Sequence, residues 1–398
     1  MEIWNEGKIK DFADVKGGKR LPKGKQLITE QNSHPYIRIR NLGKSKVLEL
    51  NSDYEYVDDE TQEFIAKYIV RAGDILVSVV GTIGLIAIVG KSLDMANQTE
   101  NCDKIINIKG IDRYYLYYYL ISPAGQEEIK RGTVGAVQPK LPLKNIQDIT
   151  VKYPSIGTQQ KIVSILNLLD DKIAANEMIN RNLSEQALTI FTYMFGSAEK
   201  NSTVAEVSFN ITDGVHNTVK DDPEGEFYLL SCKNIKGGSL LIGDFERRIS
   251  QETFDKLRKR TKLEKGDILL SSVGTVGELL LLNFNPDRYE FQRSVAIIKP
   301  NREVISSEYL YYSLLAQKQE IIHAAHGAVQ QCIFISDIKG FTIHKPTRDR
   351  LIEFDNIVVP MMEIVCHNEE ENKRLSLLRD SLLPKFMSGE LDVSELDI

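Results

Sequence analysis

The chain carries the same twelve-residue block twice. The first copy runs from Gly73 to Gly84 (GDILVSVVGTIG) and the second from Gly266 to Gly277 (GDILLSSVGTVG), with nine of the twelve positions identical. The copies are 193 residues apart in a chain of 398 residues. A sequence that repeats over half its length predicts two similar folded parts, related by an approximate two-fold axis.

Three shorter repeats support the duplication, because they follow the same order with nearly the same spacing. A Gly-Ala-Val-Gln stretch, an aromatic Tyr-Leu-Tyr-Tyr run and a strand-like hexapeptide each recur 192 to 194 residues later. The pairs are 135–138 with 327–330, 115–118 with 309–312, and 37–42 with 230–235. Chance recurrence of common strand and turn residues does not explain this order. A pair of DNA half-sites is one target that matches such symmetry.

The composition is that of a soluble globular protein, with 42% hydrophobic and 27% charged residues. No stretch reaches the roughly 18 consecutive apolar residues that a membrane span needs. The N-terminal sequence has no apolar segment of the kind that a signal peptide carries. The four cysteines (Cys102, Cys232, Cys332, Cys366) form no CxxC pair. A reduced cytoplasmic setting fits them better than a disulfide or zinc framework does.

Charge is distributed unevenly along the chain, although the net charge is −6. Residues 1–50 hold eleven Lys or Arg against six acids, and residues 247–262 hold seven against two. Residues 356–398 are acidic, with nine acids against four bases. Local patches decide the attraction to phosphate, so the two basic runs are either phosphate-facing surfaces or merely solvated faces.

Two segments of about 35 residues carry the heptad seam of a coiled coil. Their apolar positions are spaced alternately by four and three residues over more than four heptads. We therefore expect two long helices, packed antiparallel about the two-fold axis. The seam positions are Ile162, Leu166, Leu169, Ile173, Asn176, Asn180, Leu183, Ala187, Ile190 and Met194 in the first segment, and Phe354, Val358, Met361, Val365, Asn368, Asn372, Leu375, Arg379, Leu382 and Phe386 in the second.

The middle of each seam is polar, with two asparagines in each copy. An asparagine inside an apolar seam lowers stability but fixes the register of the helices. Antiparallel packing predicts that Asn176 meets Asn372 and that Asn180 meets Asn368; the alternative is a solvent-facing stripe. Pro360 lies inside the second segment, and it predicts that the regular helix begins near Val359.

The parts between these helices mix short strands and short helices without a regular βαβ rhythm, which predicts the α+β class. Strands are expected around 74–80 and 268–273, and helices at 114–122 and 307–316. The Gly-Thr-x-Gly turn lacks the lysine and the spacing of a phosphate-binding loop. The sequence has no amino-methyltransferase motif and no HExxH motif, and none of its six histidines lies at metal-ligand spacing. These observations favour a protein without catalytic residues of its own.

The order of these motifs resembles the DNA-specificity subunits of type I restriction–modification systems along the whole chain. The two repeated blocks are similar to the strand-turn signature of that family. Thr158-Gln159-Gln160-Lys161-Ile162 after Pro154 resembles the entry to its first spacer helix, with Thr or Gln in place of the usual Glu. The segment 377–391 (LLRDSLLPKFMSGEL) resembles its C-terminal signature. Asp213-Gly214-Val215-His216 resembles an Asp-Gly-Thr-His turn of its recognition domains.

The resemblance implies a non-catalytic subunit with two target-recognition domains, at 1–156 and 197–346. Two spacer helices, at 157–196 and 347–390, would form an antiparallel coiled coil, followed by a tail at 391–398. Each domain would bind one half of a bipartite double-stranded DNA site. Two methyltransferase subunits and two ATP-driven restriction subunits would complete the complex, with S-adenosylmethionine, ATP and Mg²⁺ on those partners. The chain itself would hold no cofactor and no metal.

Base recognition in the major groove needs Arg, Lys, Asn, Gln or His side chains on exposed loops. The candidates are Lys19, Arg20, Lys23, Arg38, Arg40 and Gln138 in the first part, and His216, Asn217, Lys233, Arg293 and Gln330 in the second. Gln138 and Gln330 occupy matching positions, so a shared backbone role is the alternative for them. Two other functions stay open: the DNA-recognition subunit of a related methyltransferase–nuclease, and a coiled-coil scaffold without a DNA role.

Overall fold

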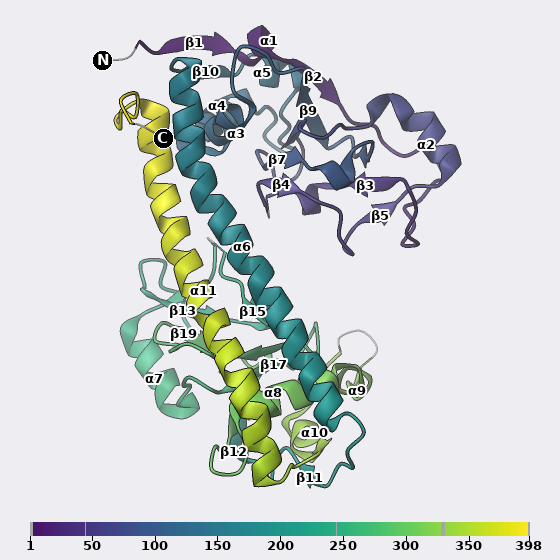
Figure 1. Ribbon diagram of the computed structural model, residues 1–398, viewed down its shortest axis with the longest axis vertical. Coiled ribbons are helices and arrows are strands. Elements are labelled where there is room, and N and C mark those ends of the chain that lie inside the picture. The colour runs from purple at the N-terminus through teal and green to yellow at the C-terminus, as the bar shows by residue number, and fades with distance from the viewer. Residues whose placement is uncertain (1–2, 44, 244, 328–330, 397–398) are drawn as a thin grey trace. The chain divides into compact units, whose positions relative to one another are not determined.

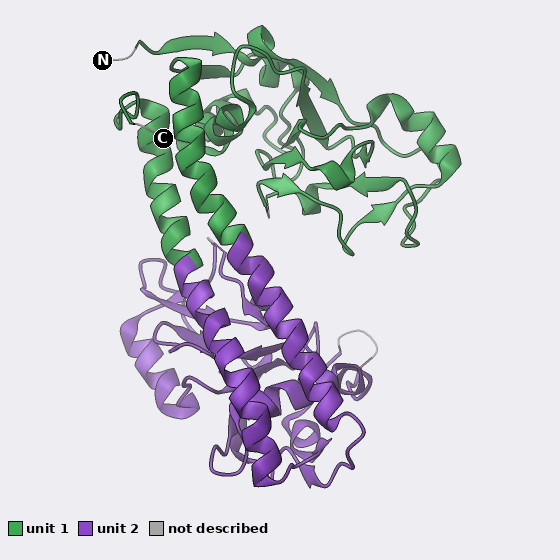
Figure 2. Ribbon diagram, viewed as in Figure 1, with its two compact units in different colours: residues 1–174, 372–398 green, residues 175–371 purple. Residues whose placement is uncertain are grey.

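The computed structural model describes residues 3–43, 45–243, 245–327 and 331–396. The chain divides into two compact units, shown in different colours in Figure 2. Unit 1 comprises residues 1–174 and 372–398, and unit 2 comprises residues 175–371. Each unit therefore contains one globular part and a portion of both long helices.

The two expected long helices are present as α6 (Ile156–Phe195) and α11 (Arg348–Ser388), of 40 and 41 residues (Figure 1). They pack antiparallel inside each unit. In unit 1, Ile162 and Leu166 of α6 share a core with Leu383 and Phe386 of α11. In unit 2, Ala187 of α6 shares a core with residues from the beginning of α11. Every one of the twenty seam positions is buried or half-buried, so the predicted coiled coil is confirmed.

The expected late beginning of the second helix is wrong. Helix α11 begins at Arg348 and continues through Pro360 and Pro384. Phe354 and Val358 precede the first proline and are fully buried in the core of unit 2. Proline removes one backbone hydrogen bond from a helix interior, at a cost of about 3 kcal/mol. We attribute the continuous helix to the burial of these upstream side chains, which offsets that cost.

The globular part of unit 1 is built from two mixed sheets and a short strand pair. The larger sheet has the strand order β2-β9-β6-β7-β4, and the smaller has the order β5-β3-β8, while β1 pairs with β10. The strands are β1 (Asn5–Lys8), β2 (Asp14–Gly17), β3 (Pro35–Ile37), β4 (Val47–Leu48), β5 (Glu55–Tyr56), β6 (Ile75–Ser78), β7 (Ile86–Val89), β8 (Asn97–Gln98), β9 (Cys102–Ile106) and β10 (Thr150–Tyr153). The helices are α1 (Ile9–Phe12), α2 (Asp59–Ile65), α3 (Arg113–Ile121), α4 (Pro123–Gly132) and α5 (Leu143–Gln147), with 3₁₀ turns at η1 (Ile39–Asn41), η2 (Ala66–Tyr68) and η3 (Lys91–Leu93).

Unit 2 repeats this plan. Its larger sheet has the order β12-β20-β17-β18, its smaller sheet has the order β16-β13-β19, and β11 pairs with β21 as β14 does with β15. The strands are β11 (Ser202–Thr203), β12 (Ser208–Asp213), β13 (Phe227–Leu230), β14 (Ile235–Lys236), β15 (Ser239–Leu240), β16 (Arg248–Ile249), β17 (Ile268–Ser271), β18 (Leu279–Leu281), β19 (Tyr289–Phe291), β20 (Val295–Pro300) and β21 (Thr342–Ile343). The helices are α7 (Gln251–Thr261), α8 (Ser307–Ala316), α9 (Lys318–His323) and α10 (Ile335–Gly340), with a 3₁₀ turn at η4 (Cys232–Asn234).

Strand register confirms that the two units are copies of one α+β fold. Ile75 lies opposite Ile105 in unit 1, and Ile268 lies opposite Ile298 in unit 2, so both partners shift by 193 residues. The expected helices around 114–122 and 307–316 are α3 and α8. The predicted duplication is therefore present in the strand pairing as well as in the sequence.

The twelve-residue block forms a strand followed by a tight turn, and a buried serine fixes the turn. Ser78 Oγ donates a hydrogen bond of 2.6 Å to the carbonyl oxygen of Thr82 and accepts one of 2.8 Å from the backbone N–H of Leu85. Ser271 makes the same two bonds, to Thr275 and from Glu278. Because the serine side chain bonds to the turn, the block serves as a structural element in both units.

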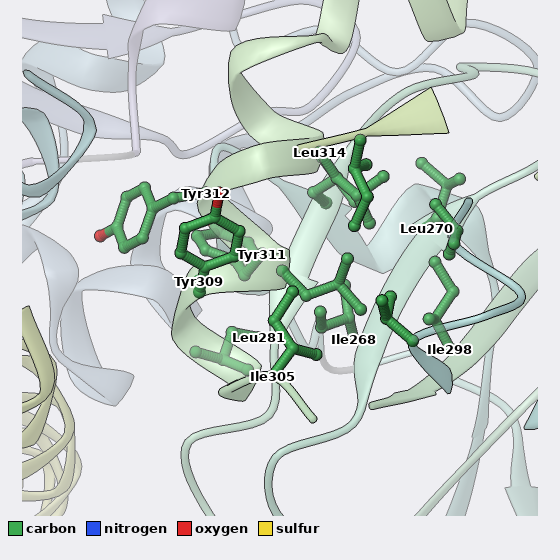
Figure 3. Packing of buried hydrophobic residues seen from close by; sticks show 14 of the residues in the cluster. Ile268, Leu270, Leu281, Ile298, Ile305, Tyr309, Tyr311, Tyr312 and Leu314 are labelled. Carbon is green, nitrogen blue, oxygen red and sulfur yellow. The ribbon is translucent and has the colours of Figure 1, made fainter. Parts of the chain in front are cut away.

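Buried tyrosines join each large sheet to the long helices. In unit 2, Tyr309 and Tyr312 of α8 belong to one buried cluster with Ile268, Leu281 and Ile298 of the large sheet (Figure 3). Tyr115 and Tyr118 hold the same places in unit 1 and are also fully buried. The repeated aromatic run is therefore core. One face of each smaller sheet shares a core with the other face of the larger sheet, and its opposite face packs in a small core of its own.

Candidate nucleic-acid interface

An open concavity of about 470 Å³ lies beside the smaller sheet of unit 1. It brings together Arg20 and Arg38, two of the six residues that the sequence predicted for this unit. Both basic and acidic side chains line it, which suits a polar ligand better than an apolar one. The lining residues are Arg20, Leu21, Lys25, Gln26, Leu27, Tyr36, Arg38, Glu55, Thr99 and Glu100.

Two of the predicted arginines share one carboxylate in this region. Arg38 Nη1 lies 2.6 Å and Arg40 Nη2 lies 2.8 Å from the same Glu55 oxygen. The arginine side chains are 44% and 52% exposed, and Glu55 is only 22% exposed, so the carboxylate lies deeper than the groups it holds. Asn41 fixes this turn, since its side-chain oxygen accepts a hydrogen bond of 2.8 Å from the backbone N–H of Arg38.

Arg20 is held in a similar way by Glu100. Its Nε lies 2.7 Å from Glu100 Oε1, and its side chain is 81% exposed. Burial raises the pKa of the Glu100 carboxyl, but hydrogen bonds from Arg20, the backbone N–H of Glu100 and Thr99 outweigh this and hold the pKa below its usual value. The carboxylate is therefore ionised at neutral pH, and Arg20 and Glu100 form a pair of opposite charges.

The other predicted residues of unit 1 do not line this concavity. Lys19 Nζ lies 5.6 Å from the centre of the Tyr68 ring, in cation–π range. Lys23 is exposed. Gln138 is exposed on a different loop, which Val134 and Lys140 close with backbone hydrogen bonds of 2.8 and 2.9 Å. The concavity therefore gathers only part of the predicted set.

In unit 2 the predicted residues lie on the corresponding loops. His216 Nε2 lies 2.6 Å from Asp213 Oδ2, and Arg260 Nη1 lies 3.8 Å from the other Asp213 oxygen. Lys233 Nζ lies 3.0 Å from Glu246, whose side chain is nearly buried. Asn217 and Arg293 are exposed. The remaining candidate, Gln330, lies outside the described residues.

Part of the basic run 247–262 is structural. Arg258 points inward from α7 and contacts Glu290, which is fully buried; the two atoms Nε and Oε1 are 2.5 Å apart. The same guanidinium donates to the carbonyl oxygens of Pro286 and Tyr289. Since these donors are used inside the fold, Arg258 is not part of a phosphate-facing surface. Lys256, Lys259 and Arg260 of the same run are exposed.

Sequence reasoning missed the acidic residues of the interface. Glu55, Glu100 and Glu246 each hold one or more of the predicted basic side chains. No spacing pattern marks them, because Glu100 is 80 residues from Arg20 in the chain. For Glu55 and Glu100 the repeat was an available signal, because it aligns them with Arg247 and Arg293 of the other half.

The asparagines of the seam form hydrogen bonds between the two helices within each unit. Asn368 Nδ2 donates a hydrogen bond of 2.8 Å to Asn180 Oδ1 inside unit 2, which is the expected pairing. Asn176 donates to Glu371 Oε2 at 2.7 Å, also in unit 2. Asn372 belongs to unit 1 and approaches the carbonyl oxygen of Ile173 at 3.5 Å. The pairing of Asn176 with Asn372 stays a prediction.

Among the described residues, no group of three or more His, Cys, Asp or Glu side chains could hold a metal ion. In the same part of the chain, no helix has the length and apolar character needed to cross a membrane.

Comparison with known proteins identifies relatives of the whole chain. Residues 1–185 match the family model described as type I restriction modification DNA specificity domain. The type I restriction enzyme MjaIX specificity subunit of Methanocaldococcus jannaschii is 25% identical, over 99% of this chain and 94% of its own length. The type I restriction enzyme HindI specificity subunit of Haemophilus influenzae is 24% identical, over 70% and 77%.

A solved structure supports the fold. The crystal structure of the S subunit of a type I restriction–modification system from M. genitalium superimposes with a TM-score of 0.55, at 16% identity, over 97% of this chain and 96% of that chain. At this identity the likeness concerns the fold alone. The duplicated fold, the paired helices and the relatives along its full length make this chain similar to the specificity subunits of type I restriction–modification systems.

Proposed function

We propose that the chain is the DNA sequence-recognition subunit of a type I restriction–modification complex, and that each unit recognises one half of a bipartite double-stranded site. One observation carries this proposal. The same strand framework occurs twice, and in each copy exposed basic side chains stand on the loops beside the smaller sheet. Loops on a rigid sheet hold Arg and His side chains in fixed positions, as base recognition requires.

The spacer helices are the part that sets the distance between half-sites. In this proposal, residues 1–156 and 197–346 are the recognition domains, and residues 157–196 and 347–390 are the spacers. A helix of the length of α6 is about 60 Å long, the length of about eighteen base pairs. The register asparagines keep the two helices from sliding, which would alter the spacing.

The same helices offer a docking surface for protein partners. Leu377 of α11 in unit 1 is 71% exposed, and Met178 of α6 and Ile364 of α11 in unit 2 are about half exposed. Exposed apolar side chains on a helix favour contact with another protein. We assign this surface to two methyltransferase subunits. Two restriction subunits complete the complex in the cytoplasm, and S-adenosylmethionine, ATP and Mg²⁺ act on those partners while this chain supplies recognition.

The test is to map N6-methyladenine in DNA from cells that express the chain with its methyltransferase subunits. The expected result is a motif with two short specific halves separated by a spacer of fixed length. Replacing residues 1–156 with the corresponding domain of a relative should change one half and leave the other half and the spacer unchanged. A single continuous motif would favour the related methyltransferase–nuclease, and no motif with intact complex formation would favour a scaffold without a DNA role.

A further inference from the structure

Backbone hydrogen bonds allow the two recognition surfaces to be compared residue by residue. In unit 1 the N–H of Thr99 donates to the carbonyl oxygen of Ile37 at 3.0 Å, and in unit 2 the N–H of Gln292 donates to that of Leu230 at 2.8 Å. Both partners shift by 193 residues. Glu100 therefore corresponds to Arg293, and Arg38 corresponds to Ser231.

A second pair of bonds fixes the loop that carries Arg20. The N–H of Gly18 donates to Cys102 at 3.2 Å, and the N–H of Gly214 donates to Val295 at 3.1 Å. A side chain at either glycine would collide with the backbone of the neighbouring strand, so glycine is required at both. Arg20 and His216 each follow their glycine by two residues and occupy the same place.

The beginning of the next helix fixes the last position. The side chain of Asp58 accepts a hydrogen bond from the N–H of Thr61, and the side chain of Ser250 accepts one from that of Thr253. Both are N-caps, of α2 and α7. Counting back three residues from each cap gives Glu55 in unit 1 and Arg247 in unit 2.

The chemistry at these four places differs between units, while the core beneath them does not. Ile37 and Leu230 are both buried and apolar, and so are the residues that precede the two caps, Val57 and Ile249. The four surface places hold Arg20, Arg38, Glu55 and Glu100 in unit 1, and His216, Ser231, Arg247 and Arg293 in unit 2. Arginines in unit 2 thus occupy the places of Glu55 and Glu100, although the residues beneath are buried and apolar in both units.

Acids on a DNA-facing surface need an explanation, because phosphate groups repel them. A carboxylate is useful there where it meets a base-edge donor, the N4 amino group of cytosine, or where it orients an arginine. An arginine in turn bonds best to the O6 and N7 atoms of guanine. Guanidinium has five N–H donors, so Arg38 can bond to Glu55 and still present others to a base.

We propose that Arg38, held by Glu55, recognises a G·C base pair in the half-site of unit 1, with Glu55 as the positioning residue. This inference rests on the proposed function. It also implies that the two half-sites differ in sequence, because unit 2 has Ser231 and Arg247 at these places. The two units share one fold and differ at these four surface places, so the expected difference between the half-sites arises there.

The test compares Glu55→Gln and Arg38→Ala with a matched control, Glu127→Gln. Glu127 forms an exposed ion pair with Arg131 on α4 of the same unit, outside the concavity. The exposed Glu127–Arg131 pair contributes little to stability, and Glu55→Gln keeps the size and hydrogen-bonding capacity of the half-buried side chain, so these variants should fold. Arg38→Ala removes an exposed side chain and should fold as well. N6-methyladenine is mapped in cells that express each full-length variant with the methyltransferase subunits. Preference for the wild-type base at one position should fall about tenfold in Glu55→Gln and more in Arg38→Ala.

Three outcomes contradict the inference while leaving the proposed function intact. The first is a recognised motif that is unchanged in both variants. The second is a change at a position that is not G·C, and the third is a change in the half-site of unit 2. A uniform loss of methylation at every site would assign Arg38 to phosphate contact and would also contradict it. If the wild-type chain directs no bipartite methylation, the proposed function fails, and the inference fails with it.

Discussion

The side-chain amide of Asn368 donates a hydrogen bond of 2.8 Å to the side-chain oxygen of Asn180, between α11 and α6 in unit 2. Asn368 is 7% exposed, so this bond replaces most of its contact with water. Replacing either asparagine by leucine leaves a buried polar group without its partner and should lower the free energy of unfolding by about 1–3 kcal/mol. The double leucine variant removes both polar groups and should lose less than either single variant. Urea denaturation of the four proteins measures this coupling, and additive losses would contradict it.

The long helices and the duplication could be predicted from the sequence, because both rest on periodicity. Heptad spacing decides which face of a helix is buried. The buried or half-buried seam follows this spacing from Ile162 to Met194 in α6 and from Phe354 to Phe386 in α11. The beginning of α11 could not be predicted in this way. Local preference placed a break at Pro360, whereas the burial of Phe354 upstream decided the outcome.

The residue types of the proposed recognition surface could be predicted from the sequence, but their ion-pair partners could not. Arg20, Arg38 and His216 could be identified as exposed basic residues near strand ends. Their carboxylate partners could not, because Glu55 and Glu100 reach them only through the smaller sheet, which joins strands far apart in the sequence. Contacts of that kind depend on tertiary structure. Arg258 illustrates the converse, since a basic run gives no sign of which member turns inward.

A half-buried charge pair lies on the long helices in unit 1 and has no counterpart at the matching place in unit 2. Arg379 Nη1 lies 3.0 Å from Asp170 Oδ1 in unit 1, and Tyr118 donates a hydrogen bond of 2.6 Å to the same carboxylate. At the corresponding place in unit 2, the Tyr312 hydroxyl lies 3.0 Å from Met362 Sδ. Arg379→Ala should lower the free energy of unfolding by about 1–3 kcal/mol, because the half-buried Asp170 carboxylate loses one of two cationic partners, the other being Lys46 at 3.6 Å.

The repeat supplies the compensating change for this variant. Methionine and alanine occupy the matching places in unit 2, at positions 362 and 187, so Asp170→Met with Arg379→Ala should recover more than half of the loss. Thermal unfolding of the single and double variants tests this. Arg181→Ala, at an exposed position of α6, is the control and should change the melting temperature little. A double variant less stable than Arg379→Ala alone would show that the two halves pack differently here.

Asp103 predicts a pH dependence of stability. Burial raises the pKa of this carboxyl to about 6, only partly opposed by Lys140. The unfolded chain has the ordinary pKa of about 3.9, so the ionised form disfavours folding. The contribution of Asp103 to stability therefore falls as pH rises from about 4 to about 6 and stays low above it. Asp103→Asn should raise the free energy of unfolding at pH 8 by at most about 3 kcal/mol and have a smaller effect at pH 4.

The difference between variant and wild type isolates this group from the other titrating residues. Denaturant unfolding at a series of pH values provides the measurement. Glu63→Gln, at an exposed carboxyl of α2, is the control and should leave the curve parallel to that of the wild type. A gain in Asp103→Asn that did not grow between pH 4 and pH 7 would contradict the assignment.

The correspondence between the surface places of the two units also predicts that a base preference can be transferred from unit 1 to unit 2. His216→Arg combined with Arg293→Glu gives unit 2 the pair that Arg20 and Glu100 form in unit 1. Because the supporting backbone bonds are the same in both units, the new pair should meet DNA in the same way. We expect one position of the second half-site to acquire the base preference of the matching position in the first. Arg293→Glu alone should weaken that half-site without a new preference, since no arginine then neutralises the acid.

The control for this graft is Lys259→Gln, which removes one positive charge from an exposed site on α7, as the graft does when His216 is neutral. It separates a change of sequence preference from a general loss of attraction to phosphate, which acts at all sequences alike. Mapping of methylated adenines distinguishes the two, because only the graft should alter the motif. A graft that lowers methylation equally at all sites, as Lys259→Gln would, contradicts base recognition at this place.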